Sequence, residues 1–266
     1  MAVHAPLVLT SPSGSDTFTR MNAIAIIPAR YASTRFPGKP LLRETGKYLI
    51  QHVYEQVGRA RLIDEVIVAT DDERIAEAVR SFHGRAVMTR ADHPSGTDRV
   101  AEVARGLDAE IVVNVQGDEP EIEPSNIDTL VGLLAGDPTV RIGTLACPFP
   151  ADADPSDPNA VKVVLDARGR ALYFSRSLIP YPRDTAGRPT VAGQWLLHLG
   201  IYAYRRSFLL ELAKLPPTPL EQREKLEQLR TLENGHAIAV GIVEKAAIGI
   251  DTPEDYAAFV RRVRHP

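Results

Sequence analysis

Cysteine is almost absent from this sequence: Cys147 is the only one among 266 residues. A single cysteine cannot form a disulfide within the chain, and no group of Cys and His residues has the spacing of a structural zinc site. Long runs of Lys and Arg are also missing and the formal net charge is −3, which argues against a nucleic-acid or anionic membrane partner. No stretch approaches the roughly 20 apolar residues of a membrane span. These absences predict a protein of the reducing cytoplasm.

Residues 1–20 differ in composition from the rest of the chain. They are rich in Ser, Thr, Pro and Gly, and their apolar run at residues 6–9 is too short for the core of a signal peptide. We expect a disordered N-terminal tail followed by a single domain over residues 21–266. Within this domain, a stretch rich in Pro, Gly and Asp at about residues 149–217 predicts a smaller inserted lobe.

Short apolar, β-branched runs alternate with helical patterns along the domain. Buried strands that alternate with helices predict an α/β fold, a three-layer α/β/α arrangement around a mixed sheet. The expected strands are 23–27, 66–69, 111–115, 142–146, 161–165 and 238–243. The expected helices are 48–59, 72–81, 96–105, 124–134 and 254–262.

One more helix is expected before the last strand. Thr218 and Glu221 have the spacing of a capping box, with Pro219 at the first helical position. Leucines at three-residue spacing continue the pattern, and Gly235 should end the helix. These leucines are Leu226, Leu229 and Leu232.

A basic loop at residues 28–40 follows the first strand and contains Arg30, Arg35 and Lys39. Ligands bind at the carboxyl ends of the strands in open α/β sheets, and three cations at that edge can neutralise several phosphate charges. The loop has neither the Walker spacing nor the G-x-G-x-x-G spacing of other phosphate sites. It therefore predicts a triphosphate site of another type, and a solvated basic loop is the alternative.

Two aspartates are candidate ligands for a metal ion. Asp118 lies in the polar turn after the strand at residues 111–115, and such a carboxylate near phosphates is a natural ligand for Mg²⁺. Asp251 is the second candidate. Because Pro253 and Glu254 follow it, Asp251 also fits the N-cap of the closing helix, and spacing alone favours the cap.

Ten short motifs, in order from about residue 23 to the C-terminus, carry a resemblance to a known family. They are IPARYASTR (27–35), PGKP (37–40), VATD (68–71), MTRADH (88–93), VQGDEP (115–120), NAVKVV (159–164), YFSR (173–176), HLGIY (198–202), LEQLR (226–230) and DTPED (251–255). Single motifs occur elsewhere, but the ordered set is specific. The chain resembles the family of 3-deoxy-manno-octulosonate cytidylyltransferases.

The resemblance implies a nucleotide-diphospho-sugar transferase fold, a homodimer and a magnesium-dependent reaction. CTP would be the donor and 3-deoxy-manno-octulosonate (Kdo) the acceptor, with CMP-Kdo for lipopolysaccharide synthesis and pyrophosphate as products. The inserted lobe would serve acceptor binding and dimerisation.

The resemblance also implies roles for individual residues. The triphosphate would be held by Arg30, Arg35 and Lys39, with Asp118 also catalytic, and Mg²⁺ would be bound by Asp118 and Asp251. Cytosine would be read by the segments around Arg90, Ser95 and Gln116. Kdo would be held by Ser175, Arg176, His198, Tyr202, Glu227 and Gln228.

The residues themselves leave alternatives for the acceptor site. His198 and Tyr202 share one face of a strand-like run, where isolated residues of these types are more often core residues. Glu227 lies off the leucine stripe, which favours a solvated face, whereas Gln228 flanks the stripe. A guanidinium such as that of Arg176 can bind the Kdo carboxylate through two hydrogen bonds.

The expected chemistry is in-line attack by the anomeric hydroxyl of Kdo on the α-phosphorus of CTP, and no side chain stands out as the general base. Two other functions fit parts of the sequence. One is an enzyme of the same kind whose acceptor is sialic acid. The other is a sugar-nucleotide binding protein without catalysis.

Overall fold

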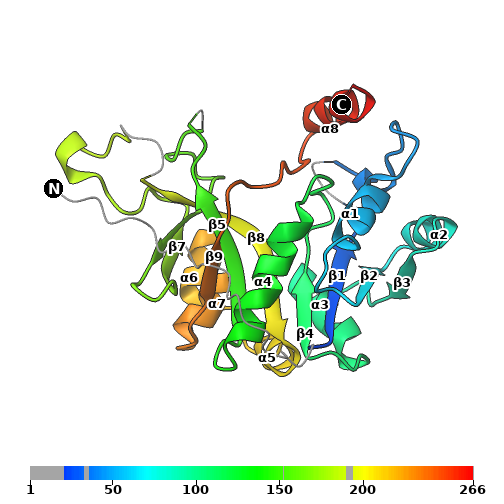
Figure 1. The fold of residues 1–266 in the computed structure, drawn as a ribbon, viewed down its shortest axis with the longest axis horizontal. Coiled ribbons are helices and arrows are strands. Elements are labelled where there is room, and N and C mark those ends of the chain that lie inside the picture. Colours follow the sequence, from blue (N-terminus) through cyan, green and yellow to red (C-terminus); the bar gives the residue numbers. More distant parts are fainter. Residues whose placement is uncertain (1–20, 33–35, 152, 190–193, 266) are drawn as a thin grey trace.

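The computed structural model describes residues 21–265 except 33–35, 152 and 190–193. The expected tail at residues 1–20 and the predicted phosphate ligand Arg35 therefore lie outside the described residues. The described chain forms one twisted sheet with helices against both of its faces (Figure 1). This is the expected three-layer α/β arrangement.

The described residues contain nine strands that belong to a single mixed sheet. The strand order is β3-β2-β1-β4-β8-β5-β9, with β6 paired to β7 and β8 off this path. Strands β3, β2, β1 and β4 are parallel, and β8 lies antiparallel between β4 and β5. Their bounds are β1 (Ala23–Ala29), β2 (Glu65–Thr70), β3 (Arg85–Met88), β4 (Ile111–Asn114), β5 (Ile142–Pro148), β6 (Lys162–Leu165), β7 (Ala171–Ser175), β8 (Leu196–Arg205) and β9 (Ala239–Ile242).

All six predicted strands form, because each is an apolar run that the sheet buries. Strand β1 alternates between the two faces, so that Ile27 packs in one core cluster and Ile26 in the other. Strands β3, β7 and β8 are additional to the six expected strands, although the run that contains His198 and Tyr202 was already strand-like in the sequence. Strand β3 has four residues and is largely exposed at the sheet edge, so it lacks the apolar run that marks a buried strand.

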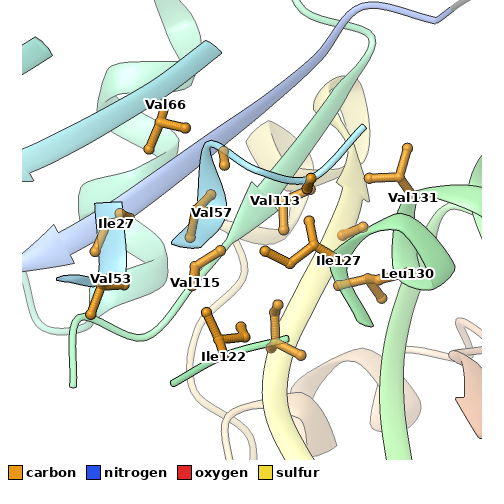
Figure 2. Close-up of a cluster of buried hydrophobic side chains, with 14 of the residues drawn as sticks. Ile27, Val53, Val57, Val66, Val113, Val115, Ile122, Ile127, Leu130 and Val131 are labelled. Carbon is orange, nitrogen blue, oxygen red and sulfur yellow. The ribbon is translucent and has the colours of Figure 1, made fainter. Parts of the chain in front are cut away.

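Helices cover both faces of the sheet. The bounds are α1 (Leu49–Val57), α2 (Glu73–Ser81), α3 (Gly96–Arg105), α4 (Pro124–Gly136), α5 (Arg206–Leu212), α6 (Pro219–Glu224), α7 (Gln228–Glu233) and α8 (Pro253–Arg264). Helices α1, α2 and α4 pack in one cluster, part of which Figure 2 shows, with Ile127 of α4 beside Val113 of the sheet and Val53 of α1 near Ile27. Helices α3, α5 and α7 pack in the cluster on the opposite face.

The prediction of a single helix after Thr218 is wrong. The predicted capping box between Thr218 and Glu221 is present, but α6 ends at Glu224 and a new helix, α7, begins at Gln228. Lys225 separates them in the left-handed conformation, with a φ of 54°. The backbone carbonyl of Glu224 accepts a hydrogen bond from Arg176 Nε at 2.7 Å, so a distant side chain satisfies a carbonyl at the end of the helix. The leucine spacing held no sign of this contact.

Helix α8 begins two residues after Asp251. Its N-cap is Thr252, whose hydroxyl accepts a hydrogen bond from the backbone N–H of Asp255 at 3.2 Å, and the Asp255 carboxylate completes a capping box. The interpretation of Asp251 as the N-cap is therefore wrong. Helix α8 packs through Phe259 and Val260 against Leu49 and Ile250.

The segment at residues 149–217 divides in the structure. The hairpin β6–β7 lies off the main path of the sheet, whereas β8 lies between β4 and β5 at its centre. Only part of this segment thus lies off the main path of the sheet, and a smaller lobe stays a prediction. No helix in the described ranges is long and apolar enough to cross a membrane.

Candidate active site

The carboxyl ends of β1 and β4 bring the basic loop and the Asp118 turn together. Gly117 allows this approach, since a Cβ atom at this position would lie 3.2 Å from the carbonyl oxygen of Pro28. The loop after β1 closes on itself, because the N–H of Gly38 donates to the carbonyl of Tyr31 at 3.0 Å. Gly38 has a φ of 72°, in the left-handed region that favours glycine. Lys39 then begins a short 3₁₀ turn, Lys39–Leu41.

A cavity of about 270 Å³ opens at this edge, and we call it the edge cavity. It brings together four of the residues predicted from the sequence to act on the triphosphate and the metal ion. Its lining includes Arg30, Lys39, Gln116, Asp118 and Asp251. Asp118 and Asp251 are far apart in the sequence, but the turn after β4 and the segment before α8 place them in one cavity.

Lys39 lies between these two turns. Its Nζ contacts Oδ2 of Asp118 at 2.7 Å and donates to the carbonyl oxygen of Ile250 at 2.6 Å. The backbone N–H of Ile250 in turn donates to the carbonyl of Asp118 at 2.9 Å. The Lys39 side chain is 13% exposed and that of Asp118 is 32% exposed, so this ion pair is partly shielded from water.

Asp118 supplies the negative charge of its turn. Burial, together with the neighbouring Asp118 carboxylate, raises the pKa of Glu119 to about 8. Glu119 is therefore mostly protonated at neutral pH. Of the two adjacent carboxyl groups, only Asp118 lines the edge cavity.

Arg30 connects the basic loop to the loop before α3. Its Nη2 donates to the carbonyl oxygens of His93 and Ser95, at 2.7 Å and 3.1 Å. The Ser95 hydroxyl is used as the N-cap of α3, where it accepts a hydrogen bond from the N–H of Asp98 at 3.1 Å. Arg30 therefore faces the edge cavity and also holds this loop in place.

Arg90 lies outside the edge cavity. Its side chain is 67% exposed and pairs with Asp92 at 3.3 Å. Its backbone N–H donates to Glu102, and the Glu102 carboxylate also contacts the ring of His93. Helix α3 thus fixes both ends of the segment from Arg90 to His93.

A second cavity, of about 440 Å³, adjoins the first, and we call it the deep cavity. Pro28, Gly96 and Gln116 line both cavities. The side-chain amide of Gln116 donates to the carbonyl oxygen of Gly200 at 2.9 Å, which ties the end of β4 to β8 at this junction.

His198 and Tyr202 of β8 both line the deep cavity. Their rings lie side by side, with centroids 5.6 Å apart. Strand β8 bulges between them, because Thr144 pairs with Tyr202 while the next residue, Leu145, pairs with Leu199. The two side chains thus share the wall of a cavity, while Tyr202 also packs against the core cluster and His198 against Phe174.

Both rings are uncharged at neutral pH. Burial lowers the pKa of His198 to about 3, and its Nε2 lies 3.0 Å from the hydroxyl of Thr144. Burial raises the pKa of the Tyr202 hydroxyl well above its ordinary value. The pair therefore offers neutral hydrogen-bonding groups to a ligand.

Glu227 and Gln228 also line the deep cavity. The predicted solvated position of Glu227 is wrong, because burial raises the pKa of this carboxyl group and its side chain hydrogen-bonds to Thr97. Gln228 is 7% exposed, and its Nε2 has no hydrogen-bond partner within the described residues. An unpaired buried donor costs free energy unless a ligand or water accepts from it.

Ser175 and Arg176 lie outside both cavities. The hydroxyl of Ser175 donates to Glu224 Oε1 at 2.7 Å. The Arg176 guanidinium donates to backbone carbonyls, among them that of Pro158 at 2.9 Å. The structure thus separates these two residues from the other four that were predicted to hold the acceptor.

The sequence analysis missed several polar residues of the deep cavity, among them Asn114 and Thr97. Asn114 and Thr97 line the deep cavity, both are buried, and Asn114 Nδ2 donates to the Thr97 hydroxyl at 3.4 Å. A signal for Asn114 was present, since it is the only polar residue in the apolar run of its strand. Thr97 had no such signal, because the first turn of a helix commonly contains a threonine.

The edge cavity fits a hydrated Mg²⁺ ion. Among the described residues no three His, Cys, Asp or Glu side chains gather as a closed metal cage. Mg²⁺ rarely uses such a cage and instead binds one or two carboxylates, with waters and substrate phosphates as its other ligands. Asp118 and Asp251 both line the edge cavity, whose lining also includes the cationic side chains of Arg30 and Lys39.

The comparisons with known proteins agree with this site. Residues 24–239 match the protein family described as cytidylyltransferase. The fold, the two adjoining cavities and this match define a nucleotidyltransferase, and the chain belongs to the cytidylyltransferase family. Within that family it belongs to the 3-deoxy-manno-octulosonate cytidylyltransferases, also called CMP-Kdo synthetases.

The relatives and solved structures support this assignment at high coverage. The chain is 54% identical over 250 residues to a 3-deoxy-manno-octulosonate cytidylyltransferase of Geobacter sulfurreducens, which covers 92% of this chain and 100% of the relative. A relative of the same name from Syntrophotalea carbinolica is 54% identical over 249 residues, or 92% of this chain and 99% of the relative.

Among solved structures, CMP:2-keto-3-deoxy-manno-octonic acid synthetase complexed with CTP superposes with a TM-score of 0.85 at 45% identity, over 91% of this chain and 98% of the other. A cytidylyltransferase from Leptospira borgpetersenii has a TM-score of 0.62 at 18% identity, over 92% of this chain and 88% of the other, which shows a shared fold.

Proposed function

We propose that this chain transfers CMP from CTP to the anomeric hydroxyl of Kdo, which gives CMP-Kdo for lipopolysaccharide synthesis and releases pyrophosphate. One observation carries the proposal: the edge cavity and the deep cavity meet at Pro28, Gly96 and Gln116. The first offers cations and carboxylates that suit a triphosphate and a metal ion, and the second offers neutral hydrogen-bonding groups that suit a polyhydroxylated sugar.

The nucleotide would occupy the edge cavity. Arg30 and Lys39, together with Arg35, would neutralise the triphosphate and the departing pyrophosphate. The segments around Arg90, Ser95 and Gln116 would read cytosine. Asp118 and Asp251 would hold Mg²⁺, which when bound neutralises charge at the α-phosphate and lowers the pKa of a coordinated hydroxyl.

Kdo would occupy the deep cavity, with its anomeric hydroxyl at the junction. His198, Tyr202 and Gln228 would donate hydrogen bonds to the sugar, and Glu227 would bind its hydroxyls. Ser175 and Arg176 remain candidates for the Kdo carboxylate. To bind it, Arg176 would exchange its present backbone partners, such as the carbonyl of Glu224, for the substrate.

The chemistry that these residues support is positioning and charge neutralisation. Pro28, Gly96 and Gln116, which line the junction, have no side chain that can take a proton at neutral pH. Holding the hydroxyl in line with the α-phosphorus removes much of the entropic cost of the reaction. Homodimer formation and a cytoplasmic location remain predictions.

A test of this function measures pyrophosphate release from CTP and Mg²⁺ with Kdo and, separately, with sialic acid and other acidic sugars. We expect release with Kdo at a kcat/KM far above that of every other acceptor. If kcat/KM were highest with sialic acid, sialic acid would be the acceptor instead of Kdo. Binding of CTP and Kdo without any release would instead favour a sugar-nucleotide binding protein.

A further inference from the structure

Lys39 and Asp118 form an ion pair at the position where the proposed function places a metal ligand. The ammonium lies 2.7 Å from Asp118 Oδ2 and 2.6 Å from the carbonyl oxygen of Ile250, the residue directly before Asp251. It therefore sits between the two segments that would hold Mg²⁺. These contacts are hydrogen bonds to the same class of hard oxygen atoms that a divalent cation prefers.

We infer that Lys39 competes with the divalent cation for Asp118, so that the metal ion enters together with the nucleotide and not before it. This inference rests on the proposed function, because it takes Asp118 as a metal ligand. A lysine ammonium and a divalent ion near one carboxylate repel each other, and the ion pair is partly shielded from the water that would screen this repulsion. Metal binding to the free enzyme must overcome that repulsion.

The nucleotide relieves the competition by giving Lys39 another partner. The triphosphate would enter the edge cavity, which Lys39 also lines. The phosphate oxygens can then accept the hydrogen bonds that the Lys39 ammonium gives to Asp118 in the free enzyme. The flexible stem of lysine allows its charged end to move between the two partners. Lys39 would thus neutralise Asp118 in the free enzyme and the phosphates in the loaded enzyme.

The alternative is that Lys39 only orients Asp118, which would bind the metal ion through its other oxygen. The two possibilities predict opposite effects when the lysine is removed. Competition predicts tighter metal binding to the nucleotide-free enzyme, whereas orientation predicts unchanged or weaker binding. Turnover does not separate them, because loss of Lys39 also removes a phosphate ligand.

The experiment titrates nucleotide-free enzyme with Mn²⁺ and measures bound metal by electron paramagnetic resonance. We expect Lys39→Met, which offers no oxygen ligand, to bind Mn²⁺ at least tenfold more tightly than the unchanged chain. Lys39→Arg keeps the charge and should bind as weakly as the unchanged chain. Lys47→Met is the matched control, because Lys47 loses the same charge from an exposed ion pair with Glu55, outside both cavities.

Thermal melts on the same samples confirm folding, and Lys39→Ala replaces Lys39→Met if the latter does not fold. Unchanged or weaker Mn²⁺ binding in the folded variant would overturn the inference. If the gain is absent, weaker Mn²⁺ binding in Asp118→Asn alone would leave the proposed metal site in place while the inference fails. If the gain is present, the double variant Lys39→Met with Asp118→Asn tests whether Asp118 is the ligand. If the tighter Mn²⁺ binding disappears in this double variant, the proposed metal site and the inference about Lys39 are both supported. If the tighter binding survives Asp118→Asn, the metal ion binds elsewhere and both are overturned.

Discussion

The hydroxyl of Thr252 accepts a hydrogen bond from the backbone N–H of Asp255, which makes Thr252 the N-cap of α8. This contact separates two roles that are adjacent in the sequence. Thr252 stabilises the helix, and Asp251 lines the edge cavity. A pair of substitutions can therefore test the two roles independently.

We predict that Asp251→Asn lowers turnover by about tenfold or more at limiting Mg²⁺, because a charged ligand is lost, with partial recovery at high Mg²⁺. Its melting temperature should not change. Thr252→Ala should show the reverse, with stability lower by about 1 kcal/mol and a normal Mg²⁺ dependence. Turnover against Mg²⁺ concentration and thermal melts on both variants check this. Normal activity and metal dependence in Asp251→Asn would remove that residue from the metal site.

We predict that Arg30→Lys lowers kcat/KM for CTP by about 10-fold to 100-fold, although the charge is kept. The guanidinium holds the carbonyls of His93 and Ser95 together through one nitrogen, and lysine cannot reproduce this geometry while facing the phosphates. Steady-state kinetics with varied CTP measure the effect. Arg80→Lys, in an exposed ion pair with Glu73, is the control. Equal kinetics for the two variants would show that charge alone matters at position 30.

We predict that Gln228→Leu raises the KM for Kdo by about threefold to tenfold, as expected for one lost hydrogen bond, and leaves the KM for CTP nearly unchanged. The protein should remain as stable as before, because leucine removes a buried donor that has no partner in the described part of the chain. Kinetics with each substrate varied, together with urea unfolding, provide the measurement. Gln222→Leu on the exposed side of α6 is the matched control. A larger effect on CTP than on Kdo would contradict the placement of the acceptor.

We predict that His198 makes the protein less stable as the pH falls from about 6.5 toward 3. The unfolded chain takes up a proton near pH 6.5, whereas in the folded protein the pKa of His198 is lowered to about 3 by burial. Stability is therefore lost as the pH drops through this window, by about 2 kcal/mol between pH 7 and pH 5. Between pH 7 and pH 5, the His198→Gln variant should therefore lose about 2 kcal/mol less stability than the unchanged chain. Urea unfolding of both proteins at the two pH values measures it, and equal losses would contradict the shifted pKa.

Local sequence patterns predicted most of the secondary structure. The six expected strands are apolar runs, and helices α2 and α4 begin at the expected start signals, Asp72 and Pro124. The same kind of pattern failed after Thr218. There the leucine spacing predicts one helix, and contacts from Ser175 and Arg176 of a distant segment divide it at Lys225.

The candidate site shows a similar division. The basic loop and the Asp118 turn were predictable, because each follows a buried strand and the carboxyl ends of parallel strands share one edge of the sheet. The choice between the two roles of Asp251 was not, since an N-cap and a metal ligand require the same residue type. The contact between Thr252 and Asp255 excluded the cap.

The sequence by itself determined most of the strands and helices, and it placed basic residues and carboxylates in the loops that line the edge cavity. Only the tertiary structure decided where the two cavities meet. Their junction depends on β8, which crosses the sheet antiparallel between β4 and β5 and bulges between His198 and Tyr202. Pairing between distant strands follows from the packing of the whole sheet, because hydrogen-bond register has no local signature in the residues of one strand.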